Sequence, residues 1–365
     1  MEQTFDPSRM QQAPAAGSGW HAQLPDDKVM LRAARDMVKD LGEARPGIYW
    51  TDMILSAATG YGGIAAAILL EPLWLKLLFG LVASLALYRA LMFIHELTHI
   101  HKNALRGFRT GWNLLVGIPL LTPSFMYEGV HTLHHKRTQY GTIEDPEYLP
   151  LALMKPWSLP VFVLVALLAP VALLIRSALL VPLGAIFPPV RRFVWQRFSA
   201  LSINPDFRRK PPEGELTRRV FWQEVGVFVW SWVLIGSLFV LGWVPVLTAL
   251  AILSLTALLN QLRTLVAHLW ENEGEAMTVT AQFLDSVNVP PPGRIAEIWA
   301  PVGLRYHALH HLMPSMPYHD LPEAHRRLFA ELGEGSTYLG ANHRGMMPLV
   351  GRIARSTMAR GRTGA

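Results

Sequence analysis

Three short histidine clusters are the most chemically informative feature of this 365-residue sequence. Within each cluster the histidines follow an i,i+4 or i,i+3,i+4 spacing, which places their side chains on one face of a helix, about one turn apart. Each cluster can therefore direct two or three nitrogens into one pocket, and neutral imidazole is the commonest metal ligand. The clusters consist of His95 and His99, of His131, His134 and His135, and of His307, His310 and His311.

A ninth histidine, His268, ends another apolar run and adds one more candidate ligand. Nine nitrogens exceed the needs of one ion, because a three-histidine zinc site already leaves only one open position. We therefore expect two metal ions with room for oxygen or water. Imidazole accepts zinc, copper, iron or nickel. A metal that uses oxygen is favoured, because chemistry on an apolar C–H bond at the mouth of a hydrophobic interior needs redox power that zinc lacks.

The composition indicates a polytopic membrane protein. Hydrophobic residues make up 51% of the chain and charged residues only 16%, whereas soluble domains usually carry about 25% charged residues. The chain has no cysteine, which excludes disulfides, iron–sulfur centres, thiolate zinc sites and cysteine nucleophiles. Any electrons must therefore come from a separate protein or cofactor.

The net charge of +6 fits two interpretations. The excess of basic residues reflects the positive-inside bias of a membrane protein, or part of it forms a docking face for an acidic electron donor. Nucleic-acid binding is not expected, because the basic residues flank apolar segments instead of forming one stripe.

Four apolar stretches are long enough to span a bilayer, which takes roughly 20 residues. They pair into two hairpins, with tight turns at Glu71-Pro72 and at Trp243-Val-Pro245. Lysines and arginines are scarce in these turns and frequent at the opposite ends. The positive-inside rule then places both termini and all three clusters in the cytoplasm, and we expect a bacterial inner-membrane protein. The four stretches are 53–70, 72–94, 225–243 and 244–262.

Two further apolar stretches, 111–127 and 158–187, do not fit as simple spans. The first contains two prolines, and the second is interrupted by three prolines and Arg176. If the clusters form one site on one side of the membrane, each stretch crosses an even number of times or not at all. Residues 177–187 reach only about 16 Å as a helix, too short to cross. We therefore predict interfacial or re-entrant helices for both stretches.

The predicted fold is all-α, with four transmembrane helices, interfacial helices and a cytoplasmic histidine-rich cap. Residues 1–45 are expected to form a polar cytoplasmic tail with a short helix over 34–41. Residues 46–335 form the membrane domain, and 336–365 form a basic C-terminal tail.

The clusters resemble the three histidine boxes of the membrane fatty acid desaturase superfamily. The segments Tyr140–Tyr148, Asn260–His268 and Gly303–His311 are similar to those of bacterial members, and the likeness covers about residues 50–330. The resemblance implies two non-haem iron ions, oxygen as co-substrate, two external electrons, and four spanning helices capped by a cytoplasmic domain. It also implies a ninth histidine ligand from the last spanning helix, which His268 matches, with Asn260 or Thr264 near a water-mediated position.

The resemblance predicts oxygen-dependent desaturation of a fatty acyl chain carried by a lipid, coenzyme A or acyl carrier protein. Because no His-Pro-Gly-Gly motif is present, the electron donor is expected to be a separate ferredoxin, rubredoxin or cytochrome b5 type protein. The alternative is a lipid or carotenoid hydroxylase or ketolase, since related enzymes use much the same boxes.

Three rival hypotheses stay open at this stage. His95-Glu96-x-x-His99 also matches a zinc metalloprotease motif, with Glu96 as general base. Glu96 and Glu128 each precede a histidine by three residues, as in a carboxylate di-iron bundle. A metal transporter would place its ligands at the bilayer midplane, whereas these lie at helix ends and in loops.

Polar residues near the boxes are candidates to orient a ligand histidine or to hold a substrate headgroup. His101 follows His99 by two residues and would face away from the ligands if the helix continued. The candidates are Glu96, His101, Asp145, Asn260, Thr264, Asp285, Arg305 and Tyr306.

Overall fold

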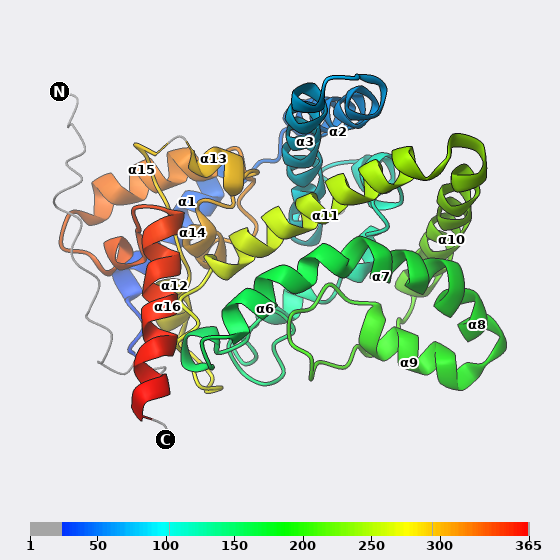
Figure 1. Cartoon of the computed structure of the whole chain (residues 1–365). Coiled ribbons are helices and arrows are strands. Elements are labelled where there is room, and N and C mark those ends of the chain that lie inside the picture. The colour runs from blue at the N-terminus through cyan, green and yellow to red at the C-terminus, as the bar shows by residue number, and fades with distance from the viewer. Residues whose placement is uncertain (1–23, 102, 294, 364–365) are drawn as a thin grey trace. The chain divides into compact units, whose positions relative to one another are not determined.

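The computed structural model describes residues 24–101, 103–293 and 295–363, and within these ranges all regular secondary structure is helical apart from three isolated bridges (Figure 1). This confirms the all-α prediction. The chain divides into two compact units. Unit 1 contains the described residues of 1–44, 133–161 and 262–365, and unit 2 contains 45–132 and 162–261. Residues 1–23 of the predicted N-terminal tail lie outside the described ranges.

Unit 2 contains most of the long apolar helices. Five helical stretches are long and apolar enough to cross a membrane, which agrees with an integral membrane protein but is one more than the four we predicted. They are α2 (Pro46–Leu69), α3 (Leu73–His99), the run Ser158–Ile186, α10 (Glu215–Leu241) and α11 (Trp243–Leu265).

The additional candidate, Ser158–Ile186, is one continuous helical run of 29 residues, not the short pieces that we expected. Arg176 does not interrupt it, because this side chain is buried and its Nη2 lies 2.9 Å from Oε1 of Glu224 on α10. Pro170 and Pro182 stand in the first turns of α7 and α8, at the points where the run changes from 3-10 or π hydrogen bonding to α-helix. The run consists of α6 (Ser158–Leu164), η5 (Val165–Leu168), α7 (Ala169–Ile175), η6 (Arg176–Leu180) and α8 (Val181–Ile186).

The other stretch, 111–127, falls in short segments and is not among the five candidates, as we predicted. These segments are α4 (Phe108–Trp112), η2 (Asn113–Gly117) and η3 (Ser124–Met126). Helix α9 (Pro188–Phe198) follows the fifth candidate. Whether 111–127 lies at a membrane interface stays a prediction.

Helices α2 and α3 form the predicted first hairpin, and Figure 1 shows them running together. Glycine allows their close approach, because a Cβ at Gly63 would lie 2.9 Å from Cβ of Ala83. The second turn differs from our expectation. Gly242, with φ of +78°, joins α10 to α11, and the two helices diverge from it (Figure 1).

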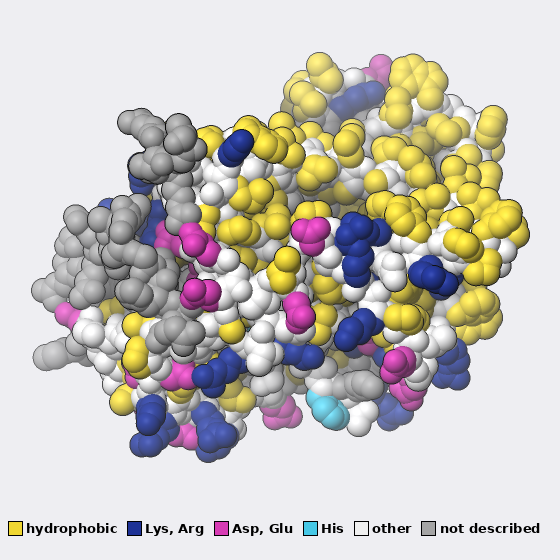
Figure 2. Space-filling model, turned by 90° about the horizontal axis from the view of Figure 1, so that it is seen from below, with side chains coloured by type: hydrophobic (Ala, Val, Ile, Leu, Met, Phe, Trp, Pro, Cys, Tyr) yellow, Lys and Arg dark blue, Asp and Glu magenta, His cyan; other side chains and the backbone are white. Residues whose placement is uncertain are grey.

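Large apolar side chains remain exposed on unit 2, as expected for helices that face lipid. Leu73 and Trp74 beside the first turn are 69% and 67% exposed, and Phe239 before the second is 88% exposed. On the face drawn in Figure 2, hydrophobic side chains form a broad area with few charges among them.

Unit 1 has a conventional hydrophobic core. Helix α1 (Lys28–Leu41), which is longer than the predicted 34–41, is capped by Asp27 and packs Met30 and Met37 against α15 (Leu321–Leu332) and Tyr338. The remaining helical segments of the chain are α5 (His131–His134), η4 (Leu151–Leu153), α12 (Val279–Asp285), α13 (Ala296–Trp299), α14 (His307–Leu312), η7 (Thr337–Ala341) and α16 (Met346–Thr363).

Candidate metal centre

Four histidines converge within unit 1. His134, His268, His307 and His311 each offer a ring nitrogen, and these nitrogens all lie within 4.8 Å of one another. The Nε2 atom of His307 lies 3.0 Å from Nε2 of His268 and 3.2 Å from Nε2 of His311. We call these four residues the four-histidine group. Four nitrogens with no sulfur donor fit iron, zinc or copper.

Helical geometry and one backbone bridge bring these residues together. His307 and His311 are one turn apart on α14, so their side chains leave the same face of the helix, with ring centroids 4.6 Å apart. His268 follows α11 by three residues and is held by a bridge to Ser286. The amide of Ala308 donates to the carbonyl of Val287, which ties α14 to the same segment.

Burial keeps most of the group uncharged. It lowers the pKa of His268 well below the ordinary value, and the neighbouring His134 lowers it further. Burial likewise lowers the pKa of His311, with neighbouring histidines adding to the effect. Metal binding requires neutral imidazole, so both rings are in the competent state at pH 7.

Asp145 orients His134. Burial lowers the pKa of His134, but the Asp145 carboxylate outweighs this, and the pKa is raised overall. His134 Nδ1 lies 2.9 Å from Oδ2 of Asp145, so Nδ1–H donates and Nε2 is left to bind metal. The amides of Gly141 and Glu147 also donate to this fully buried carboxylate.

A second chain of hydrogen bonds orients His268. Its Nδ1 lies 2.8 Å from the Tyr140 hydroxyl, which donates to Oδ2 of Asp285 at 2.7 Å. The Nδ1–H of His268 therefore donates to the tyrosine oxygen, and the tyrosine O–H donates to the carboxylate. This arrangement leaves Nε2 of His268 unprotonated. Burial raises the pKa of Asp285 to about 6, so this carboxylate is still mostly ionised at pH 7.

His307 is arranged differently. Arg263 Nη2 lies 2.8 Å from His307 Nδ1, and a guanidinium can only donate. His307 Nδ1 therefore accepts, and the ring proton resides on Nε2, from which it can donate to His268. Binding of metal at His307 Nε2 requires this proton to leave and Arg263 to release Nδ1.

Within unit 2, three further histidines form a compact set. The ring centroid of His131 lies 4.5 Å from that of His95 and 4.9 Å from that of His99, and those of His95 and His99 lie 5.1 Å apart. We call them the three-histidine group. Tyr127 stacks on His131 and its hydroxyl lies 2.9 Å from Nδ1.

Two carboxylates beside the three-histidine group are held by other residues. Tyr49 on α2 donates to Oε2 of Glu96 at 2.5 Å. Glu128 binds Arg109 at 3.2 Å and Arg219 at 2.8 Å, and Arg109 also donates to the carbonyl of Leu97 in the first box. Two arginines on Glu128 argue against its being an iron ligand of a carboxylate bundle.

The other two box histidines lie together in unit 1. The Nε2 atom of His310 is 3.2 Å from that of His135, and the His135 ring stacks on that of His311 at 4.3 Å. Among the candidate orienting residues, Glu96 and Asp145 lie beside box histidines, and Asp285 lies beside His268.

The remaining candidates lie in other surroundings. His101 is exposed and its Nδ1 accepts from the amide of Asn103. Arg305 holds the loop before the third box, through the carbonyls of Val289 and Gly293. Tyr306 belongs to the core of unit 1, and Asn260 and Thr264 are half-buried on α11.

Sequence reasoning missed five residues that contact box histidines or their partners. Tyr140 lies in a segment that resembles the family, and Tyr127 precedes His131 by one turn, so a local signal existed for these two. Tyr49 lies 47 residues from Glu96, and no local pattern connects them. Arg263 and Ser286 complete the set.

Comparison with known proteins gives two matches. The model of a family described as fatty acid desaturase matches residues 72–341, a range that contains all nine box and candidate ligand histidines. A protein of Caulobacter vibrioides (strain NA1000 / CB15N) described as a ceramide hydroxylase is 50% identical over 340 residues, which cover 92% of this chain and 95% of that protein.

Proposed function

Since the chain belongs to the fatty acid desaturase family, whose members are oxidoreductases with buried histidine clusters, we propose that it hydroxylates ceramide or a closely similar lipid in the membrane. One observation carries the substrate and the reaction, namely the 50% identity to a ceramide hydroxylase over 92% of the chain. Desaturation, the reaction that we expected first from the boxes, has less support than hydroxylation, which was our alternative.

The histidines suit the metals that this reaction needs. Two iron ions bound here would supply oxygen activation, driven by two electrons from outside the chain. We propose that the four-histidine group holds one ion and that His95, His99 and His131 hold the other. His135 and His310 remain predicted ligands. The overall reaction consumes one O₂, two electrons and two protons, converts C–H to C–OH, and releases one water.

The surrounding side chains prepare the ligands. Asp145 and the Tyr140–Asp285 pair fix the tautomers of His134 and His268, so that Nε2 of each ring faces the group. Burial of His134, His268 and His307 limits the access of bulk water to the group, which limits side reactions of an activated oxidant. We propose that a separate protein donates the electrons, since the chain has no cysteine with which to hold an iron–sulfur cluster.

The apolar helices of unit 2 fit a substrate that arrives from the bilayer. We propose that the active site and both termini face the cytoplasm, as the distribution of lysine and arginine predicts.

The test is to express the chain in a host that makes unhydroxylated ceramide, under labelled oxygen gas, and to analyse the lipids by mass spectrometry. Hydroxylation predicts a product that gains one oxygen atom from the labelled gas. A product that loses two hydrogens instead would establish desaturation. His311→Ala is expected to abolish the product, and His101→Ala is the matched control, because this histidine is exposed and lies in neither group.

A further inference from the structure

Unit 1 exposes several large apolar side chains in one region of its surface. Ile295 and Ile298 are 73% and 54% exposed, and Met347 is 76% exposed. The two isoleucines share one turn at α13, where the amide of Ile298 donates to the carbonyl of Ile295. Pro291 and Pro292 in the same loop are also exposed. We call these five residues the apolar edge. A protein surface gathers large apolar residues mainly where it contacts a membrane or another protein.

One small hydrophobic core holds both parts of the apolar edge. Ala296 lies between the two exposed isoleucines, and Leu349 lies two residues after Met347. Both are buried in the same cluster as Val266 and Leu269. Val266 directly follows the last residue of α11. The apolar edge is therefore attached to the segment at which the chain leaves α11.

The length of α11 gives the depth of this segment in the membrane. Helix α11 is a candidate span of 23 residues, which corresponds to about 34 Å, whereas the hydrocarbon core is about 30 Å thick. Asn260, Gln261 and Arg263 carry polar side chains near the end of the helix. Val266 therefore lies at about the depth of the lipid headgroups. Apolar side chains on interfacial segments reach about 5–10 Å into the boundary between headgroups and acyl chains.

Two charged residues beside the apolar edge are compatible with a lipid surface. Glu297 lies between the isoleucines in the sequence, but its carboxylate is paired with Arg305, with Nη1 and Oε1 2.8 Å apart. Arg344 is exposed shortly before α16, and a cation in this position is attracted to anionic lipid headgroups.

We propose that the apolar edge inserts into the headgroup layer of the bilayer, so that unit 1 is held on the membrane by this surface as well as by its connection to α11. Lipid is the occupant, because the edge is attached at headgroup depth and combines apolar side chains with a nearby cation. The insertion does not depend on which reaction the histidines perform.

Arg305 connects the apolar edge to the third histidine box. This buried side chain donates from Nε to the carbonyl of Val289 at 2.8 Å and from Nη2 to the carbonyl of Gly293 at 2.9 Å. It precedes His307 by two residues. The loop that carries the isoleucines is thus fixed relative to the box, and insertion of the apolar edge keeps the box beside the lipid.

Single-cysteine labelling tests the insertion. Because the chain has no cysteine, an introduced thiol is the only one that a fluorophore can label. Ile295→Cys and Met347→Cys are labelled separately with the fluorophore NBD, and the full chain is placed in phosphatidylcholine nanodiscs. Lipids with a nitroxide near the headgroup should remove most of the fluorescence at both positions. Iodide in the water should remove little of it.

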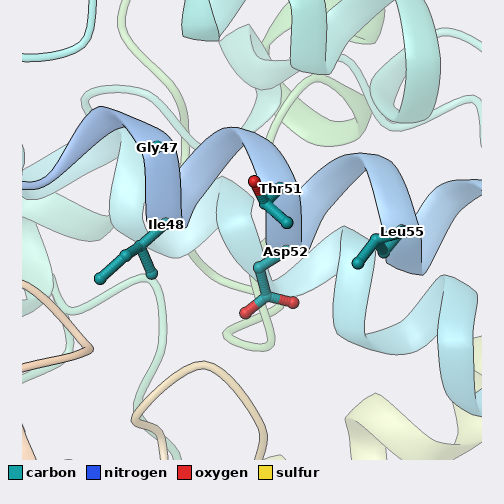
Figure 3. Close-up of a pocket in the computed structure, with 5 residues that line it drawn as sticks. All are labelled: Gly47, Ile48, Thr51, Asp52 and Leu55. Atoms are coloured by element: carbon teal, nitrogen blue, oxygen red, sulfur yellow. The ribbon is translucent and has the colours of Figure 1, made fainter.

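Two control positions calibrate the quenching. Leu55→Cys is the lipid control, because Leu55 is 61% exposed on the candidate span α2 (Figure 3). Ala330→Cys is the water control, because this residue is exposed on α15, on the same turn as the exposed Glu331. Probes at Ile295 and Met347 should behave like the probe at Leu55. Quenching by iodide as strong as at Ala330 would overturn the proposal. Protection from both quenchers would also overturn it, because protein would then cover the apolar edge.

A charge variant tests whether the edge inserts as a unit. With the probe at Met347→Cys, the second substitution Ile295→Asp should weaken quenching by the nitroxide lipid and strengthen quenching by iodide. Ala330→Asp is the matched control and should change neither. Equal quenching in the two charge variants would overturn the proposal.

Discussion

Replacing Asp145 by asparagine tests how the four-histidine group is held in place. The carboxylate is fully buried and accepts from His134 Nδ1 and from the amides of Gly141 and Glu147, at 2.8 to 2.9 Å. Asparagine has nearly the same shape, but its amide has one acceptor oxygen and a nitrogen that cannot accept. At least one donor is then left buried without an acceptor, at a cost of about 1–3 kcal/mol.

The affinity for metal should change more than the stability of the fold. Removing the carboxylate partner of a ligand histidine typically weakens metal binding about 10- to 100-fold. We therefore expect Asp145→Asn to lower iron affinity by this factor at about pH 8. The assay is iron content by elemental mass spectrometry after equilibration with graded chelator.

The same substitution should change the pH dependence of metal binding. The carboxylate raises the pKa of His134, so protons compete with metal for this ring as the pH falls. Without the carboxylate this competition is weaker, and the affinity gap between variant and wild type should narrow toward about pH 6. In the metal-free chain, the ion pair contributes stability that is complete below the unfolded pKa and is lost as the pH rises through the raised one.

Asp36→Asn is the control, because Asp36 is exposed on α1 and its carboxylate binds Lys39 one turn away. It should leave iron affinity unchanged. An Asp145→Asn protein that holds iron as tightly as Asp36→Asn at every pH would refute the idea that Asp145 positions His134.

Three further predictions concern stability. Because burial raises the folded-state pKa of Asp285 to about 6, its contribution to stability should fall as the pH rises from about 4 to about 6. Asp285→Asn should therefore flatten the dependence of the thermal unfolding midpoint on pH across this range. An unchanged slope in the variant would contradict the raised pKa of Asp285. Arg176→Met should destabilise unit 2 by about 1–3 kcal/mol, because the buried Glu224 loses one of its two arginine partners and keeps only Arg191, and the double variant Arg176→Met/Glu224→Met should recover much of this in detergent unfolding. Gly242→Ala should cost about 1–3 kcal/mol, since φ of +78° with ψ of 176° is a glycine conformation, whereas Gly236→Ala inside α10 should be neutral or stabilising in the same assay.

The histidine spacing predicted much of the site because helical periodicity is a local property. His307 and His311 share a face of α14 for the same reason that their spacing suggested it. The first hairpin and the last two long helices could be predicted from the length of their uninterrupted apolar stretches. These features need no knowledge of distant contacts.

The features that escaped prediction depend on residues far apart in the sequence. Arg176 looked like an interruption because its partner Glu224 lies 48 residues away. Tyr140 reaches His268 across 128 residues and Asp285 across 145. A sequence pattern indicates that burial of a charged or hydroxyl group would be unfavourable. It does not indicate which distant residue will pair with that group, because tertiary packing decides this.

The spread of the ligands along the chain also sets the order of events during synthesis. His135 and His310 lie within hydrogen-bonding distance, yet 175 residues separate them. At roughly 5–20 residues per second, the second leaves the ribosome about 9–35 s after the first. Every apolar helix has been translated by then. If the site holds iron as proposed, its full set of ligands is available only after every apolar helix has been translated, and a cell short of iron would accumulate metal-free protein that could be loaded later.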